Sequence, residues 1–209
     1  INSTGVYYRA MLKHIRKVLG DIQRVYPDYD AKSGYELSGF VWFQGWNDMV
    51  DAGTYPLRGQ VGSYAAYSRN LAHFIRDVRK DLNAPKLPFV IGVMGAGGPI
   101  AKYGPDQKRY ADIHGEFRKA MAAPANLPEF RGNVTAVRTE NYWDGELSEL
   151  VDRRGKINAK RRDLSKDESL NREQRDKALA DFNAKLFTKE ELQILELGVS
   201  NAAYRYLGS

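Results

Sequence analysis

The sequence predicts an α/β fold in which a parallel β-sheet is covered by helices. Three segments with helical periodicity alternate with three short apolar segments, and this alternation is typical of a parallel sheet with right-handed crossovers. The chain has 209 residues, of which 43% are hydrophobic and 28% are charged, and this suits one globular domain with a sizeable core. We therefore expect a single domain over residues 1–209.

The first helix is predicted to precede Pro27, and the first strand to follow it. Apolar residues recur at three- and four-residue spacing from Met11 to Val25, which indicates one buried helix face that ends at the proline. The segment Leu37–Phe43 is apolar on both faces. Such strands belong inside a sheet that helices cover on both sides.

Two further pairs of helix and strand follow. They are predicted as a helix over Tyr64–Leu82, a strand over Phe89–Met94, a helix over Asp106–Ala122 and a strand over Asn133–Thr139. The glycine-rich segment Gly95–Pro99 lies between the second strand and the third helix. It lacks the Gly-Lys-Ser and Gly-x-Gly-x-x-Gly patterns of phosphate-binding loops, so we interpret it as a loop on the substrate side.

The composition changes near the C-terminus. Residues 143–196 are rich in lysine, arginine, aspartate and glutamate, with sparse leucines, and we interpret them as a charged helical insertion formed by a hairpin or two helices. Thr188 and Glu191 have the spacing of a capping box at the start of a helix.

Composition also argues against several classes of function. The chain has no cysteine, which excludes disulfides and cysteine nucleophiles, and no pair of histidines has metal-ligand spacing. Its longest apolar runs have the length of strands, too short to cross a membrane. The net charge is +6, but basic and acidic residues alternate closely between Asp152 and Glu191, as on a solvated helix face. We therefore expect no nucleic acid and no membrane as partner.

The segment Trp42–Asp48 carries the candidate catalytic residues, at the predicted carboxyl end of the first strand. Ligands of open α/β sheets bind at this edge. Gly45 would let backbone approach a substrate closely. The amide of Asn47 could donate to a developing oxyanion, a contact worth roughly 3 kcal/mol in acyl transfer. The alternative is that Asn47 only holds the turn.

Three neighbouring residues are predicted to bind substrate. Gln44 either points into the site or hydrogen-bonds across the sheet. Asp48 is expected to anchor the loop as an acceptor rather than to act as a catalytic acid. Trp46 is expected near the substrate, where its ring could stack on a sugar.

These residues resemble a known family. Residues 45–48, Gly-Trp-Asn-Asp, resemble the Gly-x-Asn-Asp block of SGNH hydrolases. Residues 42–48 are also similar to the Trp-x-Gln-Gly-Glu-x-Asp block of sialate O-acetylesterases and acetylxylan esterases. Further similarity lies in residues 39–41, 70–79, 87–92 and 204–209, so the resemblance spans nearly the whole chain.

The resemblance implies a fold and an activity. The fold would be a three-layer α/β/α sandwich with a parallel sheet, of the flavodoxin-like type. The activity would be hydrolysis of acetyl esters on carbohydrates such as sialic acid or xylan, with a serine nucleophile and with Asn47 as an oxyanion donor. An acetylated carbohydrate would be the substrate, no metal or organic cofactor is implied, and the location would be periplasmic or extracellular.

The chain departs from the family pattern at two catalytic positions. The family's nucleophile lies in a Gly-Gln-Ser-Asn block, and no serine here has that context; Ser63 is better placed to cap a helix. Arg205 stands where the family's catalytic histidine is expected, and arginine cannot act as a general base because it keeps its proton. We therefore expect an N-terminally incomplete part of a serine esterase. The alternative is a catalytically inactive, carbohydrate-binding or scaffolding relative with the same fold.

Overall fold

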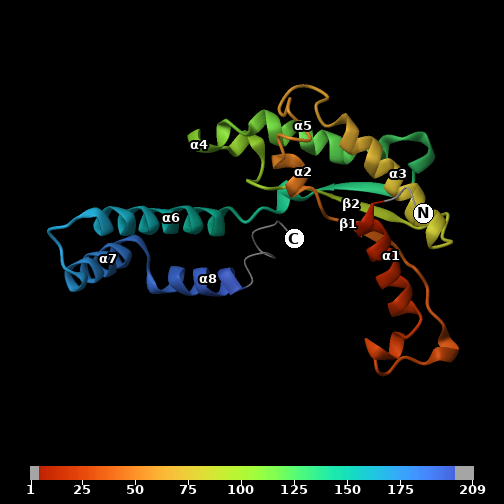
Figure 1. The fold of residues 1–209 in the computed structure, drawn as a ribbon, viewed down its shortest axis with the longest axis horizontal. Coiled ribbons are helices and arrows are strands. Elements are labelled where there is room, and N and C mark those ends of the chain that lie inside the picture. The colour runs from red at the N-terminus through yellow and green to blue at the C-terminus, as the bar shows by residue number, and fades with distance from the viewer. Residues whose placement is uncertain (1–4, 201–209) are drawn as a thin grey trace.

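The computed structural model describes residues 5–200 and shows an α/β fold around a three-stranded parallel sheet (Figure 1). The strands lie in the order β1-β2-β3, with bounds β1 (Phe40–Trp42), β2 (Phe89–Val93) and β3 (Val134–Arg138). Phe89 pairs with Phe40 on one side and with Val134 on the other, so the carboxyl ends of all three strands lie at one edge. The predicted α/β class and parallel sheet are confirmed.

In Figure 1, α3 and α5 lie on one side of this sheet, and α1 extends away from the sheet. α1 contacts α3 through a hydrogen bond of 2.8 Å from the hydroxyl of Tyr8 to Asp81. The helices are α1 (Val6–Leu19), α2 (Trp46–Val50), α3 (Ala65–Asp81), α4 (Pro105–Lys108), α5 (Ala111–Ala122), α6 (Gly145–Lys166), α7 (Arg172–Leu186) and α8 (Lys189–Ser200). This arrangement is consistent with the α/β/α sandwich that the resemblance implies.

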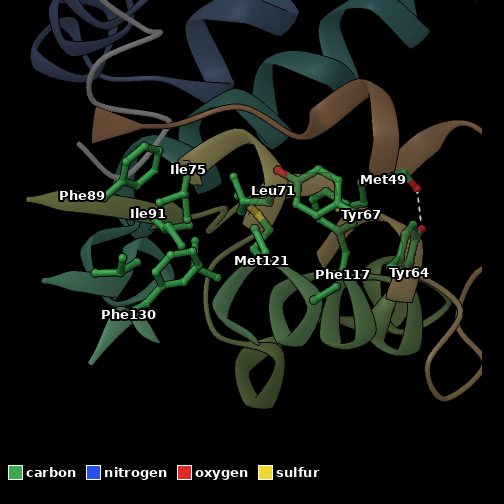
Figure 2. Packing of buried hydrophobic residues seen from close by; sticks show 14 of the residues in the cluster. Met49, Tyr64, Tyr67, Leu71, Ile75, Phe89, Ile91, Phe117, Met121 and Phe130 are labelled. Carbon is green, nitrogen blue, oxygen red and sulfur yellow. Dashed lines mark hydrogen bonds between the residues drawn. The ribbon is translucent and has the colours of Figure 1, made fainter. Parts of the chain in front are cut away.

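The main hydrophobic core lies between the sheet and the pair α3 and α5 (Figure 2). Apolar residues of α3 recur every three or four positions and turn one face inward, as the sequence predicts. The most deeply buried members are Ile75 of α3, Ile91 of β2, and Phe117 and Met121 of α5. This packing fixes both helices against the sheet.

Two predicted helices differ from the observed ones. The first helix ends at Leu19 and not near Val25, because Gly20 caps it and a short 3-10 turn follows. The third helix is broken into α4 and α5. The break leaves the ring of Tyr110 stacked on that of His114, with their centroids 5.8 Å apart.

The expectation that the first strand is covered on both faces is wrong for the described residues. β1 is shorter than predicted and has only β2 as a neighbour in the described sheet. Phe40 and Trp42 pack against the core, whereas the side chain between them, Val41, is 70% exposed. Alternation along the strand therefore separates a covered face from an open one.

The charged insertion contains three helices, α6 to α8, rather than a hairpin or two helices. In Figure 1 they extend away from the sheet as an arm, and α6 packs against both α7 and α8. A second, small hydrophobic cluster holds the arm together, centred on Leu150, Phe187 and Leu195. The predicted capping box is confirmed, because Thr188 and Glu191 each accept a hydrogen bond from the other's backbone N–H.

Candidate active-site turn

The turn after β1 begins at Gly45, which is buried at the N-terminus of α2. A Cβ atom at this position would lie 2.7 Å from the ring of Phe117 and 3.3 Å from the hydroxyl of Tyr67. Any side chain would therefore overlap with α5, so packing alone requires a glycine here. The structure gives Gly45 a structural role, and its role toward a substrate stays a prediction.

Tyr67 of α3 holds the backbone of this turn. Its hydroxyl donates to the carbonyl oxygen of Gln44 at 2.8 Å and accepts from Nε1 of Trp42 at 3.0 Å. Burial raises the pKa of Tyr67, so the hydroxyl keeps its proton. At the other end of α2, the hydroxyl of Tyr64 donates to the carbonyl oxygen of Met49 at 2.7 Å (Figure 2). The turn is thus fixed from both sides before any substrate arrives.

Gln44 and Asp48 come together on the exposed side of the turn. Nε2 of Gln44 donates to a carboxylate oxygen of Asp48 at 3.0 Å. Gln44 therefore bonds within the turn and not across the sheet, and Asp48 accepts this bond. The predicted contact of both residues with a substrate stays a prediction. Both line a cavity of about 220 Å³, together with Trp42, Tyr55, Tyr67, Asn70, Leu71 and Phe74.

Asn47 and Trp46 lie on the first turn of α2 and are exposed, Trp46 to 54%. Neither lines the cavity next to Gln44 and Asp48. The structure thus brings Gln44 and Asp48 together and places Asn47 beside them at the carboxyl edge of the sheet. The amide of Asn47 is accessible to a ligand there, and its catalytic role stays a prediction. Arg205 lies outside the described residues.

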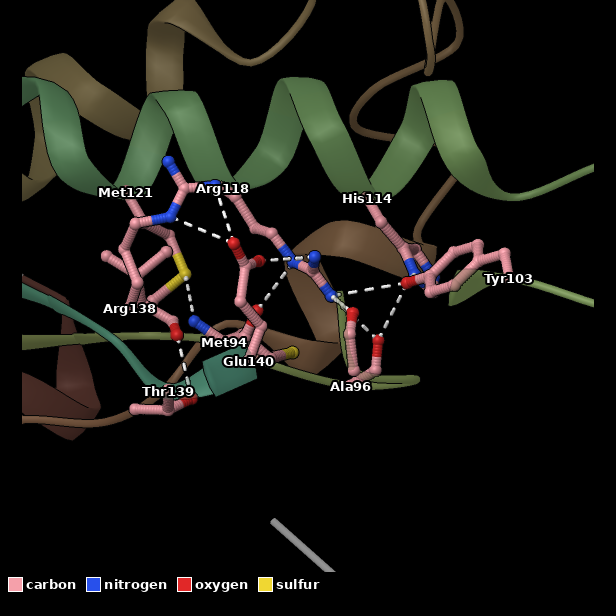
Figure 3. A network of polar contacts seen from close by, with 11 residues as sticks. Met94, Ala96, Tyr103, His114, Arg118, Met121, Arg138, Thr139 and Glu140 are labelled. Carbon is pink, nitrogen blue, oxygen red and sulfur yellow. Dashed lines mark hydrogen bonds and ion pairs between the residues drawn. The ribbon is translucent and has the colours of Figure 1, made fainter. Parts of the chain in front are cut away.

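The loop after β2 reaches the same edge and is held by a buried polar network (Figure 3). The guanidinium of Arg118, on α5, bonds to backbone oxygens of the loop and forms an ion pair with Glu140, which follows β3. Both side chains are buried. Sequence reasoning missed this network, although an arginine directly after Phe117 on a buried helix face was a signal for it.

The three histidines have different surroundings. His14 and His73 are exposed, and Nδ1 of His73 lies 3.4 Å from Nη1 of Arg76. His114 is half-buried, with Nδ1 2.6 Å from the hydroxyl of Tyr103. Burial and the charge of Arg118 lower the pKa of His114 to about 4. We therefore interpret His114, which is neutral and hydrogen-bonded to Tyr103, as a structural residue.

Three further points concern metals, membrane-spanning helices and the cap of α3. Within residues 5–200, no group of three or more His, Asp or Glu side chains is placed to hold a metal ion. None of the helices described combines the length and apolarity that crossing a membrane requires. Ser63 does not cap α3, because Tyr64 occupies the cap position and the buried Ser63 hydroxyl has no partner among the described residues.

Comparison with known proteins gives two matches. The profile of a family described as carbohydrate esterase, sialic acid-specific acetylesterase, matches residues 2–143. A protein of Arabidopsis thaliana named as a probable carbohydrate esterase is 31% identical over 72 residues, which are 34% of this chain and 24% of that relative. The alignment thus spans about a quarter of the length of the curated relative. No solved structure matches the chain.

Proposed function

Since the chain belongs to the carbohydrate esterase family of sialic acid-specific acetylesterases, we propose that the complete protein removes O-acetyl groups from sugars of the sialate or xylan type. One observation carries the proposal. Asn47 presents its amide to solvent at the carboxyl edge of the sheet, on a turn that Tyr67 and Phe117 hold in place.

The proposed reaction is acyl transfer to a serine. The serine attacks the acetyl carbonyl, the amide of Asn47 and backbone N–H groups stabilise the tetrahedral oxyanion, and water later releases acetate. In this proposal the attacking serine belongs to a part of the complete protein that carries the family's nucleophile block, because no serine of this sequence lies in such a block. The described residues would contribute the amide of Asn47, carried on a turn whose backbone Tyr67 holds.

The cavity beside the turn supports a sugar as substrate. Its lining combines polar groups of Gln44, Asp48 and Asn70 with the aromatic rings of Tyr55 and Trp42. Binding sites of small molecules commonly have such a mixture, in which a few polar groups fix the orientation. The exposed ring of Trp46 on the same turn offers a surface on which a sugar can stack.

The test is Asn47→Ala in the complete protein, assayed on p-nitrophenyl acetate and on O-acetylated sialic acid and xylan. Removing one oxyanion donor should lower kcat by about 10²- to 10³-fold and leave KM nearly unchanged. Thermal stability should not change, because the side chain is exposed. The matched control is Asn158→Ala, at an exposed asparagine on α6. Equal rates for wild type and Asn47→Ala would remove Asn47 from the oxyanion hole.

A second candidate is a carbohydrate-binding relative without esterase activity. Arg205, where the family's histidine is expected, favours it, since arginine cannot activate a serine. This candidate predicts that the complete protein binds acetylated oligosaccharides in calorimetry but releases no acetate, and that Trp46→Ala weakens binding. Measurable acetate release by the wild-type protein would rule it out.

A further inference from the structure

The loop Gly95–Gly98 lies at the carboxyl end of β2, next to the turn that carries Asn47. β1 and β2 are parallel neighbours with Trp42 opposite Ile91, so the segments that follow them leave the sheet at the same edge. The loop is a tight turn, in which the N–H of Gly98 donates to the carbonyl oxygen of Gly95 at 2.7 Å. It therefore reaches the same edge of the sheet as the proposed acyl site.

The side chain of Arg118 holds this loop through hydrogen bonds to backbone carbonyl oxygens. Nε donates to the oxygen of Met94, and Nη2 donates to those of Ala96 and Gly98, each at 3.0 Å (Figure 3). The side chain of Arg118 is only 4% exposed. A planar guanidinium presents several donors in a fixed geometry, whereas a lysine ammonium is a point charge on a flexible stem. Arginine therefore holds the three carbonyl oxygens in one fixed geometry, which a lysine does not impose.

Glu140 balances the buried charge of Arg118. Its carboxylate forms an ion pair with Nη1 of Arg118 and also accepts from Nε of Arg138 at 2.9 Å. The Glu140 side chain is 8% exposed. The backbone around Glu140 lies so close to Gly95 that a Cβ atom on that glycine would overlap with it. The pair therefore ties the end of β3 to the loop after β2.

The residue before Arg118 contacts the other loop of the proposed site. The ring of Phe117 packs against Gly45, at the start of the turn with Asn47. Two consecutive residues of α5 thus set the positions of two loops, Phe117 that of the turn after β1 and Arg118 that of the loop after β2. The helix α5 therefore fixes the distance between the turn after β1 and the loop after β2.

We propose that Arg118 and Glu140 are positioning residues of the esterase site, which hold the loop Gly95–Gly98 as a rigid wall for the sugar that bears the acetyl group. The inference rests on the function proposed above. Neither side chain touches the reacting atoms, since both act from beneath the loop. Their loss should therefore affect an acetylated sugar, which needs the wall, more than p-nitrophenyl acetate, which is small.

The test compares Arg118→Lys with Arg76→Lys in the complete protein. Arg76 is a matched control because it is also ion-paired, with Glu129, but on the outer side of α3, with 39% of its side chain exposed. For Arg118→Lys, kcat/KM on the acetylated sugar should fall by about tenfold or more. The loss on p-nitrophenyl acetate should be smaller, and the amides of Ala96 and Gly97 should exchange hydrogen faster. Arg76→Lys should leave all three measurements unchanged.

A folded Arg118→Lys protein with wild-type kcat/KM and wild-type exchange at Ala96 and Gly97 would overturn the inference. If Arg118→Lys does not fold, Tyr103→Phe replaces it. That change removes the hydroxyl that accepts from Arg118 at 3.2 Å, with no change of charge, and it should also speed exchange in the loop. If the wild-type protein hydrolyses no ester, the proposed function fails, while exchange and sugar binding still decide whether Arg118 positions the wall.

Discussion

At the scale of single residues, His114 shows how buried neighbours set the ionisation of a side chain. Its Nδ1 lies 2.6 Å from the hydroxyl of Tyr103, and that hydroxyl also accepts from Nη2 of Arg118 at 3.2 Å. Burial first, and then the nearby positive charge of Arg118, lower the pKa of His114 from 6.5 to about 4. The ring is therefore neutral at physiological pH and is part of the network beneath the Gly95–Gly98 loop.

This shift predicts a pH dependence of folding stability. Between pH 6.5 and about 4, the unfolded chain binds a proton at His114 that the folded protein does not, so the free energy of unfolding should decrease as the pH falls through this window. In urea unfolding at several pH values, His114→Asn should lose less stability across the window than wild type does. The control, His14→Asn at an exposed position of α1, should follow wild type. Equal pH dependence of wild type and His114→Asn would contradict the prediction.

At the scale of elements, α5 is the helix that organises the candidate site. It buries Phe117 and Met121 in the main core, and its Arg118 holds the loop after β2. The short helix α2 contributes one buried residue to this core, Met49. It is held by contacts from other elements, through Tyr64 to the carbonyl oxygen of Met49 and through Phe117 against Gly45. The position of Asn47 therefore depends on how α2 packs against α5.

Gly45→Ala tests this packing. The added methyl group would lie 2.7 Å from the ring of Phe117, so α2 and α5 must move apart. Overpacking of this kind should lower the free energy of unfolding by about 1 to 3 kcal/mol in urea denaturation. The control is Gly104→Ala, at a glycine whose added Cβ would meet nothing within 4 Å. An equal free energy of unfolding for Gly45→Ala and Gly104→Ala would contradict the prediction, because it would mean that the ring of Phe117 moves aside without destabilising the protein.

At the scale of the whole molecule, the described residues have two separate hydrophobic clusters. One lies between the sheet and the helices α3 and α5, and the other lies within the arm of α6 to α8. The arm also has internal polar links, since Arg153 donates to the carbonyl oxygen of Leu186 at 3.1 Å and pairs with Glu191. The family profile matches residues 2–143, and the arm begins at Gly145. We therefore expect the arm to open independently of the sheet.

Leu150→Ala tests whether the arm is an independent unit. Leu150 is 1% exposed, so its truncation should cost about 2 to 5 kcal/mol of the arm's local stability. Hydrogen exchange should speed up in α6, α7 and α8 and stay unchanged in β2. The converse control, Leu71→Ala in the main core, should speed exchange in β2 and α5. Equal loss of protection in the arm and the sheet after Leu150→Ala would show one cooperative unit.

The sequence by itself determined the order of the elements and the place of the candidate site. The predicted helix Tyr64–Leu82 and strand Phe89–Met94 differ from α3 and β2 by one residue at most at either end. The capping box at Thr188 and the turn after β1 were also predicted. All of these depend on residues close together in the chain, whose spacing carries the information directly.

Only the tertiary structure decided the rest. The exposure of Val41 depends on which strands flank β1, and the hydrogen bond between Gln44 and Asp48 depends on how α2 turns after it. The ion pair of Arg118 with Glu140 joins residues that are far apart in sequence and on different elements. The spacing of residues along the chain does not indicate such a pair. A buried charge is tolerated only where the fold places an opposite charge next to it. The sequence thus indicated the edge of the sheet at which the candidate site is expected. The tertiary packing determined which side chains surround that site.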